Sequence, residues 1–256
     1  MNSTRLILSL ILFFQFALGI LYATRTPLWQ APDEPAHYNY VRELAETGAF
    51  PVLQQGDYDP AYLEEIKARK FPPELAIDSL RYEAHQPPLY YVLAAPVYLT
   101  ARALQLDAAL LLRYFNVALA LVLSCIAYLI FARVFLTSAL LRLAGVGIIA
   151  TLPMHIAMSA AINNDTLAEI VVAVMLLFSI LRAQGKLDDR RFMLFGGLAY
   201  AVVCYFTFAF VRLVRAQRVH VRRKRFARVG SARRSGGGTT DNRAVDRPIR
   251  TARRGV

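Results

Sequence analysis

The chain has 256 residues, of which 56% are hydrophobic, and its mean hydropathy is +0.37. A composition this apolar excludes an ordinary soluble domain and predicts several membrane spans. The net charge of +12 comes entirely from the C-terminal residues. Residues 1–211 contain 15 Lys and Arg and 16 Asp and Glu, whereas residues 212–256 contain 15 Lys and Arg and 2 Asp. Residues 1–211 therefore carry no indication of nucleic-acid binding.

The first apolar segment is Leu6–Tyr22, in which Gln15 is the one large polar side chain. Small residues at 17–19 are compatible with cleavage of a signal peptide, but the apolar run continues past them, which favours an uncleaved span. Arg5 precedes the segment and is expected on the cytoplasmic side of the membrane.

Later apolar runs predict further spans. They are Tyr114–Ala132, Ala139–Ala161, Leu167–Leu181 and Phe192–Val211. Both cysteines, Cys125 and Cys204, fall inside these runs and are interpreted as small hydrophobic residues, not as a disulfide or a metal pair.

Residues 24–87 form a long polar loop after the first span, with short helices predicted over Val41–Glu46 and Tyr62–Lys70. Leu89–Leu104 follows, has 16 residues and contains Pro96. A full crossing needs about 20 residues, so we expect this run to lie on the membrane surface or to re-enter. Tyrosines that flank the apolar runs are predicted as interfacial aromatics, or alternatively as a platform for an acceptor sugar. They are Tyr38, Tyr40, Tyr90, Tyr91 and Tyr98.

Charge decides the predicted topology. If Leu89–Leu104 does not cross, the basic residues of the later loops lie on the same side as Arg5, as the positive-inside rule requires. The loop with Asp33 and the segment Asn163-Asn164-Asp165 then share the opposite surface. This arrangement has five spans, and a six-span arrangement with the C-terminal tail inside is the alternative.

Residues 212–256 are rich in Arg, Gly and Ser, lack apolar periodicity and are predicted to be a disordered basic tail. In the five-span topology the tail would be external, against the positive-inside rule. One explanation is a tail that binds RNA or anionic lipid. The favoured explanation is a shift of reading frame near Val211, after which the natural protein continues with more spans.

The segment Pro32-Asp33-Glu34-Pro35-Ala36-His37-Tyr38 follows the first span closely. On a short helix, Asp33 and His37 would share one face. An ionised carboxylate at this surface has the chemistry of a general base or a ligand of a divalent ion. The competing interpretation is a solvated acidic pair near a helix start, where negative charge is mildly favourable.

Two other polar segments lie at the ends of apolar runs. Glu83 and His85 precede Pro87-Pro88 and are predicted to face a phosphate or a metal, or else to form a charged loop leading into a helix. Asn164 and Asp165 form a second acidic site, and the same residues are favoured at a helix N-terminus. His155 is interpreted as a packed or interfacial histidine.

The order of three motifs resembles the N-terminal half of GT-C integral-membrane glycosyltransferases, over about residues 5–210. The motifs are Pro32–Tyr38, His85-Gln86-Pro87-Pro88-Leu89-Tyr90-Tyr91, and Pro153-Met154-His155 followed by Asn163-Asn164-Asp165. Protein O-mannosyltransferases, aminoarabinose transferases and oligosaccharyltransferase catalytic subunits belong to this superfamily. The wording is most similar to bacterial relatives of family 39.

The resemblance implies an all-α polytopic membrane bundle in the bacterial inner membrane, with its site facing outward and residues 1–211 as a truncated module. It implies inverting transfer of a sugar from a polyprenyl-phosphate donor, with Asp33 as base or acceptor-orienting group beside Glu34. Asp165 would help to hold the donor phosphate or a metal ion, and Asp33 is the other metal candidate. Many relatives have Lys before the prolines, whereas this chain has His85-Gln86. The need for a divalent ion and the acceptor stay open.

Glu83, His85, Asn164, Asp165 and His37 are the predicted substrate-binding residues. The alternative function is a non-catalytic polytopic membrane protein, such as a transporter fragment or an assembly subunit. Transporters tend to place ionisable groups in mid-span and to carry internal repeats. Here the ionisable groups gather at span ends, which favours the transferase.

Overall fold

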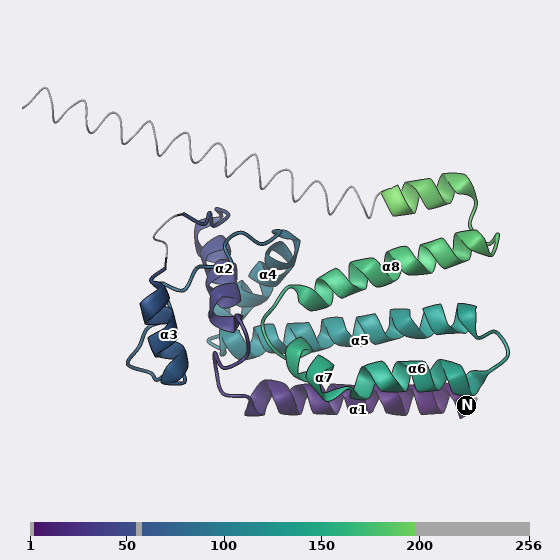
Figure 1. Ribbon diagram of the computed structural model, residues 1–256, viewed down its shortest axis with the longest axis horizontal. Coiled ribbons are helices and arrows are strands. Elements are labelled where there is room, and N and C mark those ends of the chain that lie inside the picture. The colour runs from purple at the N-terminus through teal and green to yellow at the C-terminus, as the bar shows by residue number, and fades with distance from the viewer. Residues whose placement is uncertain (1–2, 55–57, 198–256) are drawn as a thin grey trace, which may run out of the picture. The chain divides into compact units, whose positions relative to one another are not determined.

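The computed structural model describes residues 3–54 and 58–197, all within one compact unit, Met1–Leu213. The described residues form helices and contain no strand, as predicted. The helices are α1 (Ser3–Arg25), α2 (Glu34–Thr47), α3 (Pro60–Ala68), α4 (Leu89–Ala103), α5 (Ala108–Val134), α6 (Ala139–Thr151), α7 (Pro153–Ser159) and α8 (Asp165–Ala183) (Figure 1). Residues 189–197 are also helical. Most of the predicted span Phe192–Val211, and all of the predicted tail 212–256, lie outside the described residues.

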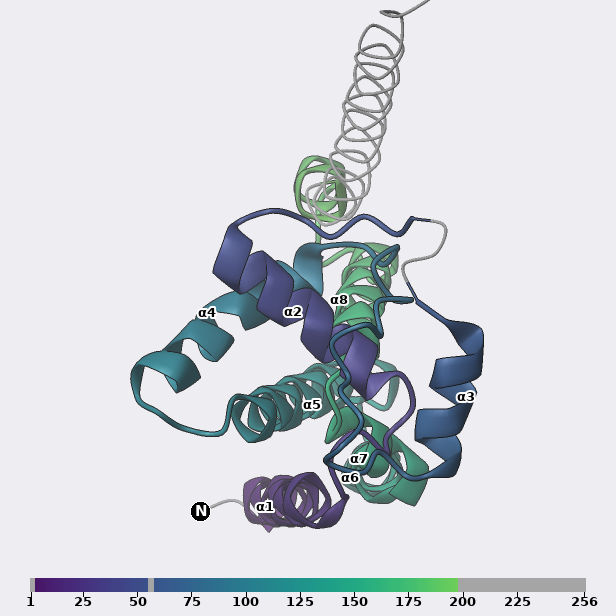
Figure 2. The ribbon, with the colours of Figure 1, turned by 90° about the vertical axis from the view of Figure 1, so that its left-hand side faces the viewer.

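Helices α1, α5, α6 and α8 run side by side and form a bundle (Figure 1). α1 and the α6–α7 pair run toward the end of the bundle where α2, α3 and α4 lie, whereas α5 and α8 begin there. Residues 26–54, 58–107 and 160–165 therefore gather at this end, which we call the polar end (Figure 2). The loops after α5 and α8 lie at the opposite end, where the Gln184 amide donates to the Arg133 carbonyl at 2.7 Å.

Three of the described helices, α1, α5 and α8, are long and apolar enough to cross a membrane. The α6–α7 pair makes a fourth crossing if it is one broken span. Large apolar side chains on these helices are exposed on the protein surface, such as Phe13 at 68% and Leu140 at 76% of their area. Such a surface suits a lipid environment, since soluble monomers rarely expose apolar patches on this scale. The chain has the architecture of a membrane protein.

The predicted single span Ala139–Ala161 is wrong in detail, because α6 and α7 meet at an angle of 60°. Leu152, between them, is extended with ψ 114°, and Pro153 follows as the first residue of α7. Proline lacks an N–H and disfavours helical backbone in the residue before it, so the helix breaks at this position.

Close packing inside the bundle depends on small residues. A Cβ at Gly145 of α6 would lie 2.6 Å from the ring of Phe131 on α5, and one at Gly19 of α1 would lie 2.8 Å from Val117. Small residues let membrane helices approach closely and gain van der Waals contact.

Helix α4 has 15 residues and packs against α2 at the polar end, in agreement with the prediction that Leu89–Leu104 does not cross. The tyrosines that were predicted as interfacial lie in, or pack against, one core within the protein. Tyr40, Tyr90, Tyr91 and Tyr98 are buried in one core between α2 and α4, where the rings of Tyr40 and Tyr91 stack with centroids 3.5 Å apart. Pairing of two amphipathic helices buries the aromatic face that each would otherwise present to lipid.

Candidate functional site

Every residue predicted for the site lies at the polar end of the bundle (Figure 2). Asp33 and Glu34 stand at the start of α2, and Glu83 and His85 lie just before α4. Asp165 is the first residue of α8. Two loops far apart in the sequence thus share one surface, as the topology argument predicted.

Glu34 and Arg113 form a buried ion pair at the centre of the polar end, with side chains 0% and 2% exposed. Arg113 Nε and Nη2 each donate to one carboxylate oxygen at 2.6 Å, the bidentate geometry that arginine favours. Nη1 donates to the carbonyls of Ala23 at 2.9 Å and Thr26 at 2.7 Å, and Nη2 to Pro27 at 3.2 Å. Arg113 therefore ties α5 to the C-terminal end of α1 and the loop after it.

The carboxylate of Glu34 also binds two backbone N–H groups. Trp29 donates to Oε2 at 3.0 Å, and Ile162 donates to Oε1 at 3.2 Å. Glu34 thus joins the loop after α1 to the loop between α7 and α8. The Glu34 carboxylate is closed off from solvent. Of the predicted Asp33-Glu34 pair, only Asp33 is therefore open to a substrate and stays a candidate for the acid–base role.

Asn116, one turn further along α5, is a second anchor and is 0% exposed. Its amide donates to the carbonyl of Ala161 and, at 3.1 Å, to that of Asn163. These bonds satisfy backbone carbonyls of a buried loop that has no helical partner for them. They hold the segment that leads into Asp165.

Gln86 connects the two predicted site segments directly. Its amide nitrogen donates to Glu83 Oε2 at 2.7 Å, and its amide oxygen accepts from Asn164 Nδ2 at 3.2 Å. Glu83 is 9% exposed. The predicted residues Glu83 and Asn164 are therefore brought together, because both hydrogen-bond to the side chain of Gln86. These bonds occupy polar groups that would otherwise be open to a ligand.

His37 is buried behind this surface, 5% exposed, and its Nδ1 lies 2.7 Å from the Tyr91 hydroxyl. Burial lowers the pKa of His37 to about 4, with Asp33 opposing the shift and His85 adding to it. His37 is therefore neutral at pH 7. Its side chain is closed off from solvent and contacts Tyr91, and this geometry gives no support to the predicted binding role.

His85 is exposed, and its Nδ1 lies 2.9 Å from the carbonyl oxygen of Tyr82. A carbonyl only accepts, so Nδ1 carries the proton and Nε2 is the nitrogen left for a further partner. Among the predicted residues of the loop before α4, His85 is the one that can reach a ligand.

Asp33 is exposed and lines a pocket of ≈ 380 Å³, the Asp33 pocket. Its other lining includes Trp29, Gln30, Lys67, Lys70, Phe71 and Tyr82. Burial raises the pKa of the Tyr82 hydroxyl, and the nearby Asp33 carboxylate raises it further. Asp33 adopts φ 59° at the N-terminus of α2, where extended backbone is usual.

Asp165 is exposed and lies at the mouth of a second, mainly apolar pocket of ≈ 770 Å³ between α5, α6 and α8. His155 and Glu169 also line it, with His155 Nε2 3.1 Å from Glu169 Oε2. His155 is thus a paired side chain, in keeping with the packed or interfacial role predicted for it.

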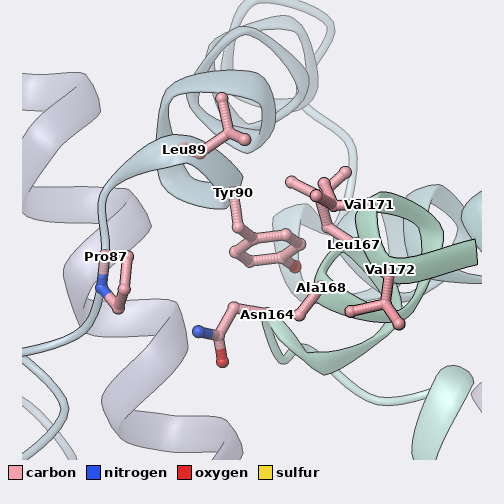
Figure 3. Close-up of a pocket in the computed structure, with 8 residues that line it drawn as sticks. All are labelled: Pro87, Leu89, Tyr90, Asn164, Leu167, Ala168, Val171 and Val172. Atoms are coloured by element: carbon pink, nitrogen blue, oxygen red, sulfur yellow. The ribbon is translucent and has the colours of Figure 1, made fainter. Parts of the chain in front are cut away.

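A third pocket of ≈ 220 Å³ separates α4 from α8 (Figure 3). The Tyr90 ring projects between the helices toward Leu167 and Val171, and Asn164 lies near Pro87 at the edge. Its lining is almost wholly apolar apart from Asn164.

Asp33 and Asp165 were the predicted metal candidates. Within residues 3–54 and 58–197 no group of three or more His, Cys, Asp or Glu side chains is arranged to hold a metal ion. Both carboxylates influence the same buried pair, since Asp33 acts on His37 and Asp165 on Tyr91.

Sequence reasoning missed Arg113, Asn116, Lys67 and Lys70. Arg113 had a usable signal, because an ionisable residue within a membrane helix is costly and needs a partner. It was placed just outside a span that was predicted to begin at Tyr114. The lysines gave no signal, since only the tertiary fold brings the end of α3 to the same pocket as Asp33.

Comparison with known proteins identified no relative: no family model, no curated protein and no solved structure matches this chain.

Proposed function

We propose that this protein is a membrane glycosyltransferase, or the N-terminal part of one. It moves a sugar from a polyprenyl-phosphate donor to an acceptor on the extracytoplasmic face of a bacterial inner membrane. The observation that carries the proposal is the exposed carboxylate of Asp33 in a pocket that also contains two lysines. The same end of the bundle has an apolar pocket between α4 and α8 and the Asp165 end of a longer apolar pocket. A lipid-linked donor and a polar acceptor need such neighbouring sites at a membrane surface.

Asp33 is the general base of the proposed reaction. Its carboxylate takes the proton of an acceptor hydroxyl while that oxygen forms a bond to the anomeric carbon of the donor sugar. The bond between the anomeric carbon and the phosphate oxygen breaks, and the phosphate leaves on its lipid. Attack from the face opposite the leaving group inverts the configuration at the anomeric carbon.

The donor lies toward α4 and α8 in this proposal. Its hydrocarbon chain takes the apolar pocket of Figure 3, and its phosphate lies at the polar rim near Asn164. Only the imidazolium form of His85, in which both ring nitrogens carry a proton, would donate from Nε2 to the phosphate. Asp165 is set back at the mouth of the neighbouring pocket.

The test uses the purified chain in lipid vesicles with a radiolabelled polyprenyl-phosphate hexose and a mixture of saccharide acceptors. Asp33→Asn should lower transfer by about a hundredfold or more, the usual contribution of a general base. Asp78→Asn is the matched control, because Asp78 is a 64% exposed carboxylate on the same loop that pairs with Arg42 outside the Asp33 pocket. Unchanged transfer by Asp33→Asn would remove Asp33 from the reaction.

A further inference from the structure

The Asp33 pocket contains two ammonium groups that the proposed proton transfer does not use. Lys67 lies on α3 and Lys70 lies in the turn that ends it, and both line the pocket together with Asp33. Both lysines are exposed, so they can meet a ligand without losing all their hydration.

These lysines differ from the neighbouring arginines in having no close carboxylate. Three arginines of the polar end are held at 2.6–2.7 Å by acidic partners: Arg42 by Asp78, Arg69 by Glu74 and Arg81 by Glu43. Lys67 has Glu64 at 3.7 Å, and Lys70 forms no ion pair with the residues that the structure describes. Positive charge in the pocket is thus available to an anion.

The backbone around the pocket is held in an uncommon conformation. Among the described non-glycine residues with positive φ, four line this pocket: Trp29 at 68°, Asp33 at 59°, Lys70 at 57° and Phe71 at 56°. Such conformations are strained for residues other than glycine and tend to gather at ligand sites.

Lys70 also has a local explanation, which supplies a control. It follows α3 at the position where glycine usually ends a helix, with the Phe71 N–H donating to the Ile66 carbonyl at 2.9 Å. Gln105 ends α4 in the same way, with φ 55°, and lies outside the pocket. Helix ending alone therefore does not explain Trp29, Asp33 or Phe71.

We propose that the Asp33 pocket binds the acceptor, and that the acceptor is a saccharide carrying a phosphate or carboxylate group. The acid group is held by Lys67 and Lys70, and a hydroxyl faces Asp33. Trp29, Phe71 and Tyr82 supply aromatic lining, and the Gln30 side chain supplies an amide. A neutral sugar would leave Lys70 without an ionic partner and Lys67 with only the 3.7 Å contact to Glu64, so the pocket selects the anionic one.

This inference rests on the proposed function only for naming the ligand as the acceptor, because binding can be measured without transfer. Trp29 is the single tryptophan of the chain, so its fluorescence reports this pocket. Glucose 1-phosphate titrated into the purified chain in detergent should give a saturable change. Glucose and inorganic phosphate should each need at least about tenfold higher concentration, since each lacks one of the two recognised groups.

Undecaprenyl phosphate is the competing probe. A saturable signal with the lipid phosphate and none with glucose 1-phosphate would make this the donor site and overturn the acceptor assignment. A response to inorganic phosphate as strong as that to glucose 1-phosphate would also overturn it, because no sugar would then be recognised.

Lys70→Gly separates binding from folding. Glycine relieves the positive φ, so the melting temperature should rise by about 2 °C while affinity for glucose 1-phosphate falls at least about tenfold. Gln105→Gly is the matched control: it should give a similar rise in melting temperature and unchanged affinity. Wild-type affinity in Lys70→Gly would overturn the inference.

The two proposals fail separately. Glucose 1-phosphate binding that depends on Lys70, without sugar transfer by the chain, would support the anion-binding pocket and contradict the proposed transferase function. Transfer that depends on Asp33, without any effect of Lys70→Gly on binding or on acceptor KM, would support the transferase function and contradict the inference of an anionic acceptor.

Discussion

Asp33 and Glu34 are neighbours in the chain, yet they belong to two opposite kinds of polar centre. Glu34 is fully buried, paired with Arg113, and bound by two backbone N–H groups. Asp33 is exposed beside lysines that have no close acidic partner. The first centre is closed and completes its hydrogen bonds within the protein, whereas the second leaves its charges available to a ligand.

The difference teaches how a short motif can serve both fold and chemistry. A buried charge is tolerated only when it is paired and hydrogen-bonded, so Glu34 is committed to joining α2, α5 and two loops. That commitment holds Asp33, one residue earlier, at the surface in a left-handed conformation. The closed centre therefore positions the open one.

The largest expected effect comes from breaking the closed centre. Arg113→Met leaves Glu34 charged and unpaired inside the protein and should cost about 3–5 kcal/mol, enough to remove most folded protein. Melting temperature and the yield of monodisperse protein in detergent measure this. Arg102→Met, at an exposed arginine of α4, should behave as wild type. Wild-type melting of Arg113→Met would contradict the account of this centre.

The double variant Glu34→Leu/Arg113→Met sharpens the same comparison. Apolar replacement of a simple buried ion pair is often neutral. Here the carbonyls of Ala23, Thr26 and Pro27 would also lose their donor, so the double variant should recover only part of the loss. Full recovery would show that these backbone bonds contribute little.

His37 predicts a pH dependence next in size. Its folded pKa of about 4 lies below the ordinary 6.5, so the unfolded chain takes up a proton that the folded chain refuses. Stability should therefore fall as the pH drops from 6.5 toward 4, by about 3 kcal/mol in all, and the loss should stop below pH 4. Melting curves at several pH values should show a smaller fall for His37→Gln. The exposed His85→Gln should keep nearly all of the wild-type fall, because His85 makes only the smallest contribution to the His37 shift. An identical fall in all three proteins would remove His37 as its cause.

Asn116→Leu tests the second anchor. Two buried carbonyls, those of Ala161 and Asn163, lose their amide donor, at a cost of about 2 kcal/mol. Ser124→Ala is the matched control on α5, because that buried hydroxyl has no partner among the described residues. Equal melting temperatures for the two variants would mean that the Asn116 bonds do not hold the loop before α8.

Gln86→Leu should have the smallest effect on stability, about 1 kcal/mol, since its partners remain near water. Its local effect should be clear: backbone amides in residues 160–165 should exchange hydrogen faster once Asn164 is released. Gln184→Leu breaks a side-chain bond to Arg133 at the opposite end and should leave that exchange unchanged. Unaltered hydrogen exchange in Gln86→Leu would mean that Gln86 does not link the segment before α4 to the segment before α8.

Apolar periodicity and charge predicted most of the architecture. Helices α1 and α8 match predicted spans to within three residues at each end, whereas α5 begins six residues before its predicted span. The charge distribution indicated that Asp33 and Asp165 share one end. These features depend on local composition and on a rule of membrane insertion that acts on the sequence itself.

Which polar side chains are buried and paired, and which are open to a ligand, could not be predicted from the sequence because it depends on tertiary contacts. Nothing local distinguishes Asp33 from Glu34, because their roles follow from Arg113, 79 positions away along the chain. The tyrosines of α4 were likewise assigned to the interface, since their burial requires α2 as a partner. The break between α6 and α7 was the exception, because Pro153 gave a local signal that was not used.

The shared surface of Asp33 and Asp165 is the claim on which the account depends, and cysteine labelling tests it most directly. In a background with Cys125 and Cys204 replaced by Ala, single cysteines at positions 33, 165, 136 and 186 would be exposed to a membrane-impermeant maleimide in sealed vesicles of known orientation. The account predicts labelling of 33 and 165 from the outer compartment, and of 136 and 186 from the inner one. Labelling of 33 and 165 from opposite compartments would contradict it.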